Sequence, residues 1–222
     1  MRDIETTLRE GLRQLGLTLN AQQIAQLLDY QDLIAKWTRV YNLTAVRDPA
    51  EMMTHHLLDS LAAIAPLRRH LAQAGLAQGS RLLDVGSGAG LPGVVVAICC
   101  PEVQVTCVDT VAKKAAFIKQ AALALKLPNL LGLHARVETL CPPKVPAFDV
   151  VCSRAFASLP DFVQWSMVAL APAGVWMAMK GKHPADELAG LPATVEVFHV
   201  EQLQVPGLDA ERCIVWMQRK DN

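Results

Sequence analysis

The chain has 222 residues, 52% of them hydrophobic, which is enough to bury the core of one large domain. Its 21 lysines and arginines balance 21 aspartates and glutamates, and the formal net charge of zero excludes a globally basic nucleic-acid-binding domain. No apolar run reaches the ~20 residues of a membrane span and the first residues, MRDIETTLRE, lack a signal peptide's apolar stretch, so we expect a cytoplasmic protein without membrane association.

The first part of the chain is predicted to be helical. Apolar residues recur at helical spacing in IAQLLDYQDLIAKW and again in MMTHHLLDSLAAIAPL. Asn20 and Gln23 have the spacing of a capping box before the first of these segments. Before the second, Asp48 supplies a cap and Pro49 the first helical position. We therefore expect residues 1–78 to form an N-terminal helical cap.

From residue 79 onward, short β-branched runs alternate with helical stretches. Helices are predicted over residues 93–100, 112–127 and 159–170, and strands at RLLDVG, VQVTCVD, LLGLHARV, FDVVCSR, VWMAMKG, ATVEVFHVEQLQV and ERCIVWMQR. Strands that alternate with helices indicate parallel βαβ units, whereas the last two strands suggest an antiparallel hairpin. Residues 79–222 are therefore predicted to form an α/β domain with a mostly parallel sheet.

The first strand runs into a glycine-rich loop, LLDVGSGAGLPG, with glycines at 86, 88, 90 and 93. In a doubly wound sheet the first βα turn lies against the ligand, and glycines let the ligand approach the backbone. A dinucleotide-binding loop has the pattern G-x-G-x-x-G. Here the pattern is G-x-G-x-G, and Leu91 stands where the third glycine of that motif belongs.

Two acidic residues accompany this loop. Asp84 lies near the end of the first strand, where its charge would repel a pyrophosphate and suit a cationic ligand such as S-adenosylmethionine. Asp109 ends the second strand and can accept hydrogen bonds from ribose hydroxyls. Both ligand classes carry that ribose, so Asp109 does not discriminate between them.

Five segments together resemble the bacterial small-subunit ribosomal RNA guanine-N7 methyltransferases, also called glucose-inhibited division protein B. They are YNLTAVRDPAEMMTHHLLDSL, DVGSGAGLPG, SRAFASL, MKGK and VPGLDAERCIV, within a resemblance that extends from Leu17 to Trp216. The resemblance implies a class I methyltransferase fold, Rossmann-like with a mostly parallel seven-stranded sheet, and an N-terminal helical cap. It also implies S-adenosylmethionine as methyl donor and N7 of a guanine in 16S rRNA as acceptor.

The resemblance and the loop pattern together define a predicted site. Matched by motif, the resemblance implies a donor site that includes Gly86, Leu91, Val137, Glu138 and Arg154, to which the loop pattern adds Gly88 and Asp109. RNA contacts are expected from Arg136, Arg154 and Lys180, and the last two are expected to position the reacting groups. The alternatives are an ion pair of Arg154 with Asp149 or Glu138, and solvated surface charges at the other two positions.

The expected acceptor predicts catalysis without a general base. Guanine N7 carries an in-plane lone pair and no proton at neutral pH, so methyl transfer is an in-line displacement governed by positioning. Accordingly, SRAFAS stands where amino-group methyltransferases have D/N-P-P-Y. The adjacent His55 and His56 would face about 100° apart on a helix, so we expect packing and a hydrogen bond there, with Asp59 nearby. Phe156 would stack on the guanine or pack in the core.

The six cysteines lack metal-binding spacing and mostly lie in apolar runs, so we expect no metal site. Three other functions remain open at this level. One is a methyltransferase that acts on a small molecule or protein, and another is an NAD-dependent oxidoreductase, which Asp84 and Leu91 oppose. A third is a non-catalytic nucleotide- or RNA-binding module, which the intact glycines, Asp109 and Arg154 oppose. The expected partner is 16S rRNA or the 30S subunit, bound by a monomer.

Overall fold

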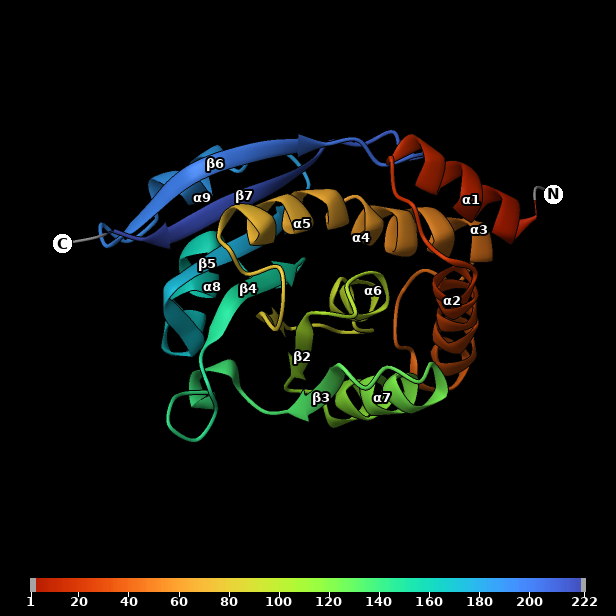
Figure 1. Cartoon of the computed structure of the whole chain (residues 1–222), viewed down its shortest axis with the longest axis horizontal. Helices are drawn as coiled ribbons and strands as arrows, with labels where there is room; N and C mark the ends of the chain where they lie inside the picture. Colours follow the sequence, from red (N-terminus) through yellow and green to blue (C-terminus); the bar gives the residue numbers. More distant parts are fainter. Residues whose placement is uncertain (1–2, 221–222) are drawn as a thin grey trace.

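The computed structural model describes residues 3–220 as a seven-stranded sheet flanked by helices (Figure 1). The strands are ordered β3-β2-β1-β4-β5-β7-β6. The first five are parallel, and β7 pairs antiparallel with both β5 and β6. Their bounds are β1 Arg81–Val85, β2 Gln104–Asp109, β3 Leu130–His134, β4 Phe148–Arg154, β5 Leu170–Lys180, β6 Val195–Leu203 and β7 Arg212–Arg219.

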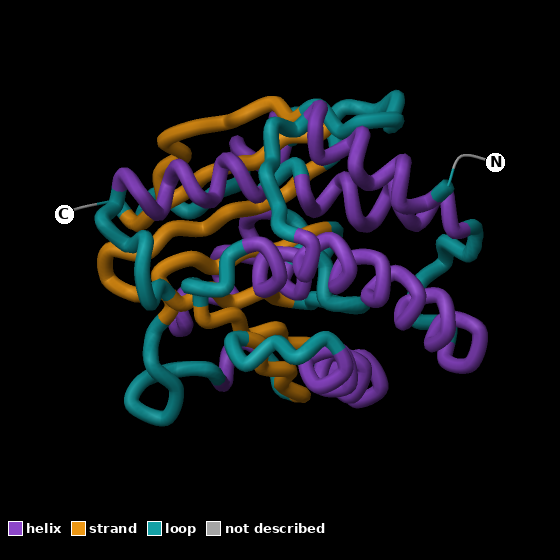
Figure 2. Tube along the Cα trace, turned by 45° about the vertical axis from the view of Figure 1, so that its right-hand side comes forward, coloured by secondary structure: helices purple, strands orange, loops and turns teal. Residues whose placement is uncertain are grey.

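Helices cover both faces of this sheet, and Figure 2 shows helices running in front of the strands. The N-terminal ones are α1 Ile4–Gln14, α2 Ala21–Tyr41, α3 Pro49–Met52, the π-helical turn η1 Met53–Leu58, α4 Asp59–Leu61 and α5 Ile64–Gln73. The later ones are α6 Gly93–Cys99, α7 Ala112–Ala124, the 3₁₀ turn η2 Val137–Thr139, α8 Leu159–Ser166, the 3₁₀ turn η3 Met167–Ala169 and α9 Ala185–Ala189.

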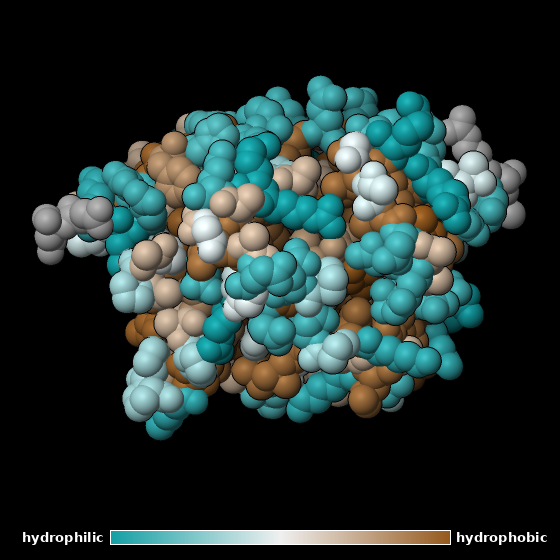
Figure 3. Space-filling view, in the orientation of Figure 1, coloured by the Kyte–Doolittle hydropathy of each residue, from teal (hydrophilic) through white to brown (hydrophobic). Residues whose placement is uncertain are grey.

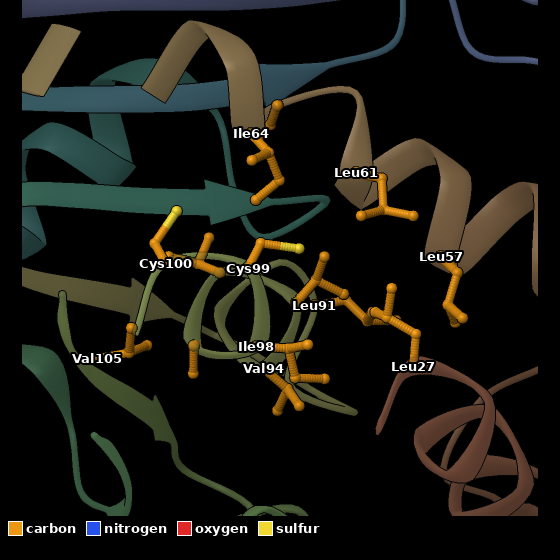
Figure 4. Packing of buried hydrophobic residues seen from close by; sticks show 14 of the residues in the cluster. Leu27, Leu57, Leu61, Ile64, Leu91, Val94, Ile98, Cys99, Cys100 and Val105 are labelled. Carbon is orange, nitrogen blue, oxygen red and sulfur yellow. The ribbon is translucent and has the colours of Figure 1, made fainter. Parts of the chain in front are cut away.

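Alternation along the strands divides the core into two clusters. In β1, Leu82 joins the cluster beneath α2, α5, α6 and α7, whereas Leu83 and Val85 join the cluster beneath α8. This follows from the two-residue period of a strand, which sends successive side chains to opposite faces. The N-terminal helices share the first cluster with α6, where Leu27 and Leu57 lie opposite Val94 and Ile98 (Figure 4).

All seven predicted strands are present, and the α/β class and the mostly parallel seven-stranded sheet are confirmed. Some bounds differ, since β3 already ends at His134, where a strand to Val137 was predicted, and β5 begins at Leu170, where a strand from Val175 was predicted. The helix expected over residues 159–170 is shorter, because α8 ends at Ser166 and β5 already begins at Leu170. The short helix α9 has no counterpart among the elements predicted from the sequence. The strand order reverses at β1, which lies between β2 and β4. In doubly wound sheets, ligands bind at this point, beside the carboxyl ends of the parallel strands.

Both predicted helix starts in the N-terminal region are confirmed. The side chain of Asn20 accepts a hydrogen bond from the amide of Gln23 at 2.9 Å, and the Gln23 side chain accepts one from the Asn20 amide at 3.0 Å. Asp48 Oδ1 accepts from the amides of Ala50 and Glu51, with Pro49 at the first helical position. These side chains satisfy amides that a helix start leaves without partners.

The second helical segment is not one continuous helix. Residues 53–58 form a wide π-helical turn, α4 follows, and the chain turns at Ala62 and Ala63 before α5. Pro66 explains the new start, because proline has no amide to donate and is tolerated in the first turn of a helix. The π-turn places Asp59 and the carbonyl of His55 toward Arg154 of β4, as described below.

Hydrophilic residues alternate with smaller hydrophobic areas over the face seen in Figure 3. Within residues 3–220, no helix combines the length and the apolar character that crossing a membrane requires.

Candidate active site

The glycine loop joins β1 to α6, and its conformation and packing require its four glycines. Gly86, Gly88 and Gly90 have φ angles of 65°, 58° and 87°, a left-handed conformation that side chains disfavour. Gly93 has a different reason, since a Cβ there would meet the Cys107 sulfur and lie 2.8 Å from Asp84 Oδ2. Three glycines therefore set the path of the loop, and the fourth lets α6 approach the sheet.

Asp84 lies beneath this loop, which corrects the expectation that it faces a cationic ligand. Its side chain is fully buried, and its Oδ2 accepts a hydrogen bond from the Gly93 amide at 2.9 Å. Cys107 and Cys152 flank it on the neighbouring strands, and the Cys107 sulfur lies 3.9 Å from Oδ2. Burial raises the pKa of Asp84 to about 7, against the opposing effects of the Gly93 amide and of the charge on Arg154.

Replacing Asp84 by asparagine should remove a pH dependence of stability. Because the folded-state pKa lies above that of an exposed carboxyl, the free energy of unfolding should fall as pH rises from about 4 to about 7 and then level off. Between pH 5 and pH 8 the wild-type loss should be on the order of 3 kcal/mol, and Asp84→Asn should lack it. Urea denaturation at both pH values measures this, and equal losses in the two proteins would contradict it.

A pocket of about 680 Å³ opens beside the loop at the carboxyl ends of β1 and β2, a volume suited to a nucleoside-sized ligand. We call it the glycine-loop pocket. It brings together five predicted site residues, Gly86, Asp109, Arg136, Val137 and Glu138. The rest of its lining is Val85, Val108, Thr110, Val111, Lys114, Ala135, Ala155, Phe156 and Trp165.

Asp109 holds the wall of this pocket together. Its Oδ2 accepts a hydrogen bond from the Gly88 amide at 3.0 Å, and its Oδ1 accepts one from the Val111 amide at 2.8 Å. Lys114 Nζ lies 3.9 Å from Oδ2. An ionised carboxylate has about four lone-pair sites, so Asp109 keeps capacity for further donors. Gly88 thus contacts Asp109 through its backbone amide and does not itself line the pocket.

Arg136 and Glu138 form the solvent-exposed rim of the pocket. Arg136 Nη2 lies 3.2 Å from Glu138 Oε1. The backbone amide of Glu138 lowers the pKa of this carboxyl, and the Arg136 hydrogen bond and charge act in the same direction. Val137 between them is buried and supplies an apolar wall. Glu138 is therefore an ionised acceptor at neutral pH.

Leu91 does not reach the pocket. Its side chain is buried in the core, where it lies near Leu27 of α2 and Ile98 of α6 (Figure 4). A donor-site role for Leu91 stays a prediction. Phe156 does reach the pocket, since its ring lies against Gly86, so that a Cβ at Gly86 would collide with it. Trp165, which the sequence analysis did not single out, packs edge-on against Phe156 with ring centroids 5.8 Å apart.

A second, smaller hollow of about 240 Å³ lies beyond the end of β4, and we call it the arginine pocket. It holds the predicted Arg154 and Lys180, and its lining is Asp59, Arg154, Ala155, Met179, Lys180, Gly181, Leu203, Arg212 and Cys213. Lys180 Nζ donates to Glu187 Oε2 at 2.7 Å and to the Ala157 carbonyl at 2.9 Å. Ala155 lines both pockets and has a φ of 51°, which is uncommon for a residue with a side chain.

The ion-pair partner of Arg154 differs from both alternatives considered from sequence. Its Nη1 donates to Asp59 Oδ2 at 2.7 Å and to the His55 carbonyl at 2.8 Å. Asp149 instead accepts from the Arg81 amide, and Glu138 pairs with Arg136. Arg212, whose Nε donates to Asp59 Oδ1 at 3.0 Å, is a pocket residue that the sequence analysis missed. Arg212 stands in VPGLDAERCIV, one of the five segments that carry the family resemblance, and this could have marked it as a candidate site residue.

His56 packs and hydrogen-bonds as expected for a structural histidine. His56 is buried, its Nε2 lies 2.8 Å from Thr44 Oγ1, and burial lowers its pKa to about 4. His56 is therefore neutral at physiological pH. Within the described residues, no three His, Cys, Asp or Glu side chains are grouped as a metal site requires.

Comparison with solved structures bears on the fold. The chain is similar to TrmN from Thermus thermophilus, with a TM-score of 0.55 and 20% identity over 76% of this chain and 53% of that one. It is also similar to a SAM-dependent methyltransferase from Aquifex aeolicus, with a TM-score of 0.53 and 18% identity over 77% of this chain and 98% of that one. These likenesses show a Rossmann-like class I methyltransferase fold.

Comparison of sequences bears on the family. The chain is 77% identical to the ribosomal RNA small subunit methyltransferase G of Polaromonas sp. strain JS666, over 99% of this chain and 96% of that protein. It is 69% identical to the protein of the same name from Acidovorax sp. strain JS42, over 96% of this chain and 95% of that protein. A family model described as GidB, rRNA small subunit methyltransferase G, matches residues 23–215. With the glycine loop and both pockets inside that range, the chain belongs to the rRNA small subunit methyltransferase G family.

Proposed function

We propose that this chain transfers a methyl group from S-adenosylmethionine to N7 of a guanine in 16S rRNA, by in-line displacement without a general base. The family supports rRNA as the substrate, and the methyltransferase fold supports the donor. One observation carries the proposal beyond the family name: the glycine-loop pocket and the basic arginine pocket meet at Ala155, where β4 ends. A donor and an acceptor held in adjoining pockets are within reach of each other.

The residues of the glycine-loop pocket fit the donor. S-adenosylmethionine supplies an electrophilic methyl group on a sulfonium. The free acceptor capacity of Asp109 suits ribose hydroxyls, and Gly86 allows close approach of the ligand to the backbone. Val137 and Phe156 offer apolar contact to a nucleobase, and Glu138 offers a further acceptor at the rim. Five lining residues thus match the needs of an adenosine, while Gly88 and Leu91 lie behind the pocket wall.

The acceptor's own chemistry makes a general base unnecessary. Guanine N7 has a free lone pair at neutral pH, so the protein has to align it and has no proton to remove. The arginine pocket offers the charges for this task, since Arg154 and Lys180 can hold phosphate or guanine oxygens. Arg136, on the rim of the other pocket, is a third candidate for RNA contact.

We also propose that residues 1–78 act as a cap on residues 79–222 and shape the acceptor side. The supporting observation is that Asp59 and the His55 carbonyl, both in the cap, hold Arg154 of β4. The expected partner is 16S rRNA or the 30S subunit, bound by a monomer. The expected cofactor is S-adenosylmethionine without a metal.

The methyl-transfer rate should be nearly flat from about pH 6.5 to pH 8.5, because no essential base titrates in that range. The His56 pKa of about 4 keeps this side chain neutral throughout the range. Asp84 does titrate near pH 7, but it lines neither pocket, so it should alter stability and not rate. Single-turnover rates at saturating donor measure the profile. A rate that rises about tenfold per pH unit and loses that slope in His55→Ala or His56→Ala would contradict it.

The decisive experiment locates the methyl group. Donor labelled in its methyl group is incubated with the protein and 30S subunits, naked 16S rRNA or total cell protein in parallel. Label is expected in one guanine of 16S rRNA. N7 methylation is identified by borohydride reduction, which labilises the methylated base, followed by aniline cleavage of the chain at the abasic site. Label in protein or in a small molecule would overturn the proposed acceptor.

A further inference from the structure

A buried carboxylate from the N-terminal helices joins two arginines of the sheet. Asp59 begins α4, directly after the π-helical turn, and its side chain is only 4% exposed. Its Oδ2 accepts from Arg154 Nη1 at 2.7 Å and its Oδ1 accepts from Arg212 Nε at 3.0 Å. The two arginines come from β4 and β7, which are not neighbours in the sheet. Asp59 is thus the shared anion of two cations that line the arginine pocket.

The same helical segment holds Arg154 a second time. The His55 carbonyl, within the π-turn, accepts from the same Nη1 at 2.8 Å. In the described part of the chain, no hydrogen bond uses Nε or Nη2 of Arg154, or Nη2 of Arg212. The N-terminal helices therefore bind Nη1 of Arg154 and Nε of Arg212. The unused donors of these two pocket-lining side chains are left for a ligand. π-turns of this kind occur frequently at functional sites.

Stability alone explains this arrangement poorly. A buried ion pair must offset the cost of removing its charges from water, and apolar residues of similar volume often give equal or greater stability. What the carboxylate does provide is direction: a guanidinium is a planar fork, and fixing one edge fixes where the other edge points. The orientation of the guanidinium matters most where its free N–H groups have to donate hydrogen bonds to an oxygen of the ligand.

We propose that Asp59 is a positioning residue, which orients Arg154 and Arg212 so that their remaining donors meet phosphate or guanine oxygens of the RNA acceptor. This inference rests on the proposed function. It assigns the N-terminal helices a direct part in alignment, through a side chain that touches neither donor nor acceptor.

The central test compares Asp59→Asn with wild type in methyl transfer to 30S subunits or 16S rRNA. Asparagine preserves the size of the side chain and one acceptor oxygen but removes the charge that both arginines share. The turnover number should fall about tenfold, while KM for the donor stays within about twofold, because Asp59 does not line the glycine-loop pocket. Calorimetric donor binding and the melting temperature are measured on the same samples.

Two further variants separate positioning from folding. Ser60→Ala alters the next residue, which is equally buried and whose Oγ has no partner among the described residues, so it should preserve the wild-type rate. Asp59→Glu restores the charge with one additional methylene and should recover part of the rate lost in Asp59→Asn. If Asp59→Asn fails to fold, Asp59→Glu decides: a folded variant with a reduced turnover number supports positioning, and a wild-type turnover number overturns it.

A readout independent of activity completes the design. Phenylglyoxal labelling, mapped by peptide mass spectrometry, should modify Arg154 and Arg212 faster in Asp59→Asn than in wild type, because their shared anion is weakened. A folded Asp59→Asn with a wild-type turnover number would overturn the proposal, whether or not the labelling of the two arginines changes. If wild type itself transfers no methyl group to rRNA, the proposed function fails, and the labelling comparison still decides whether Asp59 restrains the arginines.

Discussion

Arg154→Ala should lower the single-turnover methyl-transfer rate about 100-fold, a loss typical of misaligned reacting groups. Arg154 lies at the end of β4 beside the junction of the two pockets, and Asp59 and the His55 carbonyl already direct its guanidinium. Arginine stays protonated throughout the accessible pH range, so the variant should be slow at every pH without a new pH dependence. The donor-site role that the resemblance implies for Arg154 stays a prediction. Because Arg154 lines the arginine pocket and not the glycine-loop pocket, we expect its removal to change donor affinity little.

The control for Arg154 has to account for the buried partner. Removing the arginine leaves Asp59 with Arg212 as its remaining hydrogen-bond partner among the described residues, so part of any loss would come from destabilisation. Arg154→Lys retains the charge but not the fork, and it should remain slow while melting closer to wild type. Arg13→Ala, on exposed α1, serves as a matched arginine removal and should preserve the rate. A folded Arg154→Ala with a rate within about threefold of wild type would refute the positioning role.

Asp109→Ala should weaken binding of S-adenosylmethionine and S-adenosylhomocysteine by on the order of 1.5–3 kcal/mol. The reason is the loss of hydrogen bonds from the ligand ribose to a charged acceptor in the glycine-loop pocket. The structure adds a second contribution, because Asp109 also holds the amides of Gly88 and Val111 and thereby the shape of the loop. Isothermal titration calorimetry of the folded variant measures the combined loss.

Asp109→Asn separates the two contributions. Asparagine retains one acceptor oxygen for a loop amide but loses the charge, so its loss of affinity should lie between wild type and Asp109→Ala. Asp29→Asn, on the exposed surface of α2, is the matched control and should bind as wild type. Unchanged affinity in a folded Asp109→Ala would remove this residue from the donor site, and tight NADH binding by wild type would point to a different ligand class.

Local patterns in the sequence were sufficient for much of the fold. The order of the seven strands and of helices α6, α7 and α8, the capping box at Asn20 and the glycine loop after β1 were all predicted, because each depends on residues a few positions apart. Gly86, Asp109, Val137 and Glu138 also meet in one pocket as expected, since carboxyl ends of adjacent parallel strands and the loops after them share one edge of a sheet.

The contacts that join the arginine pocket to the N-terminal helices were decided only by the tertiary structure. Asp59 meets Arg154 across 95 residues and Arg212 across 153 residues of sequence. Asp84 is buried beneath the loop, whereas sequence reasoning placed it at the ligand. Periodicity tells which face of an element is apolar, but it does not tell which element covers that face. That choice follows from packing the whole chain at once, because a long-range ion pair forms only where core packing has already brought its partners together.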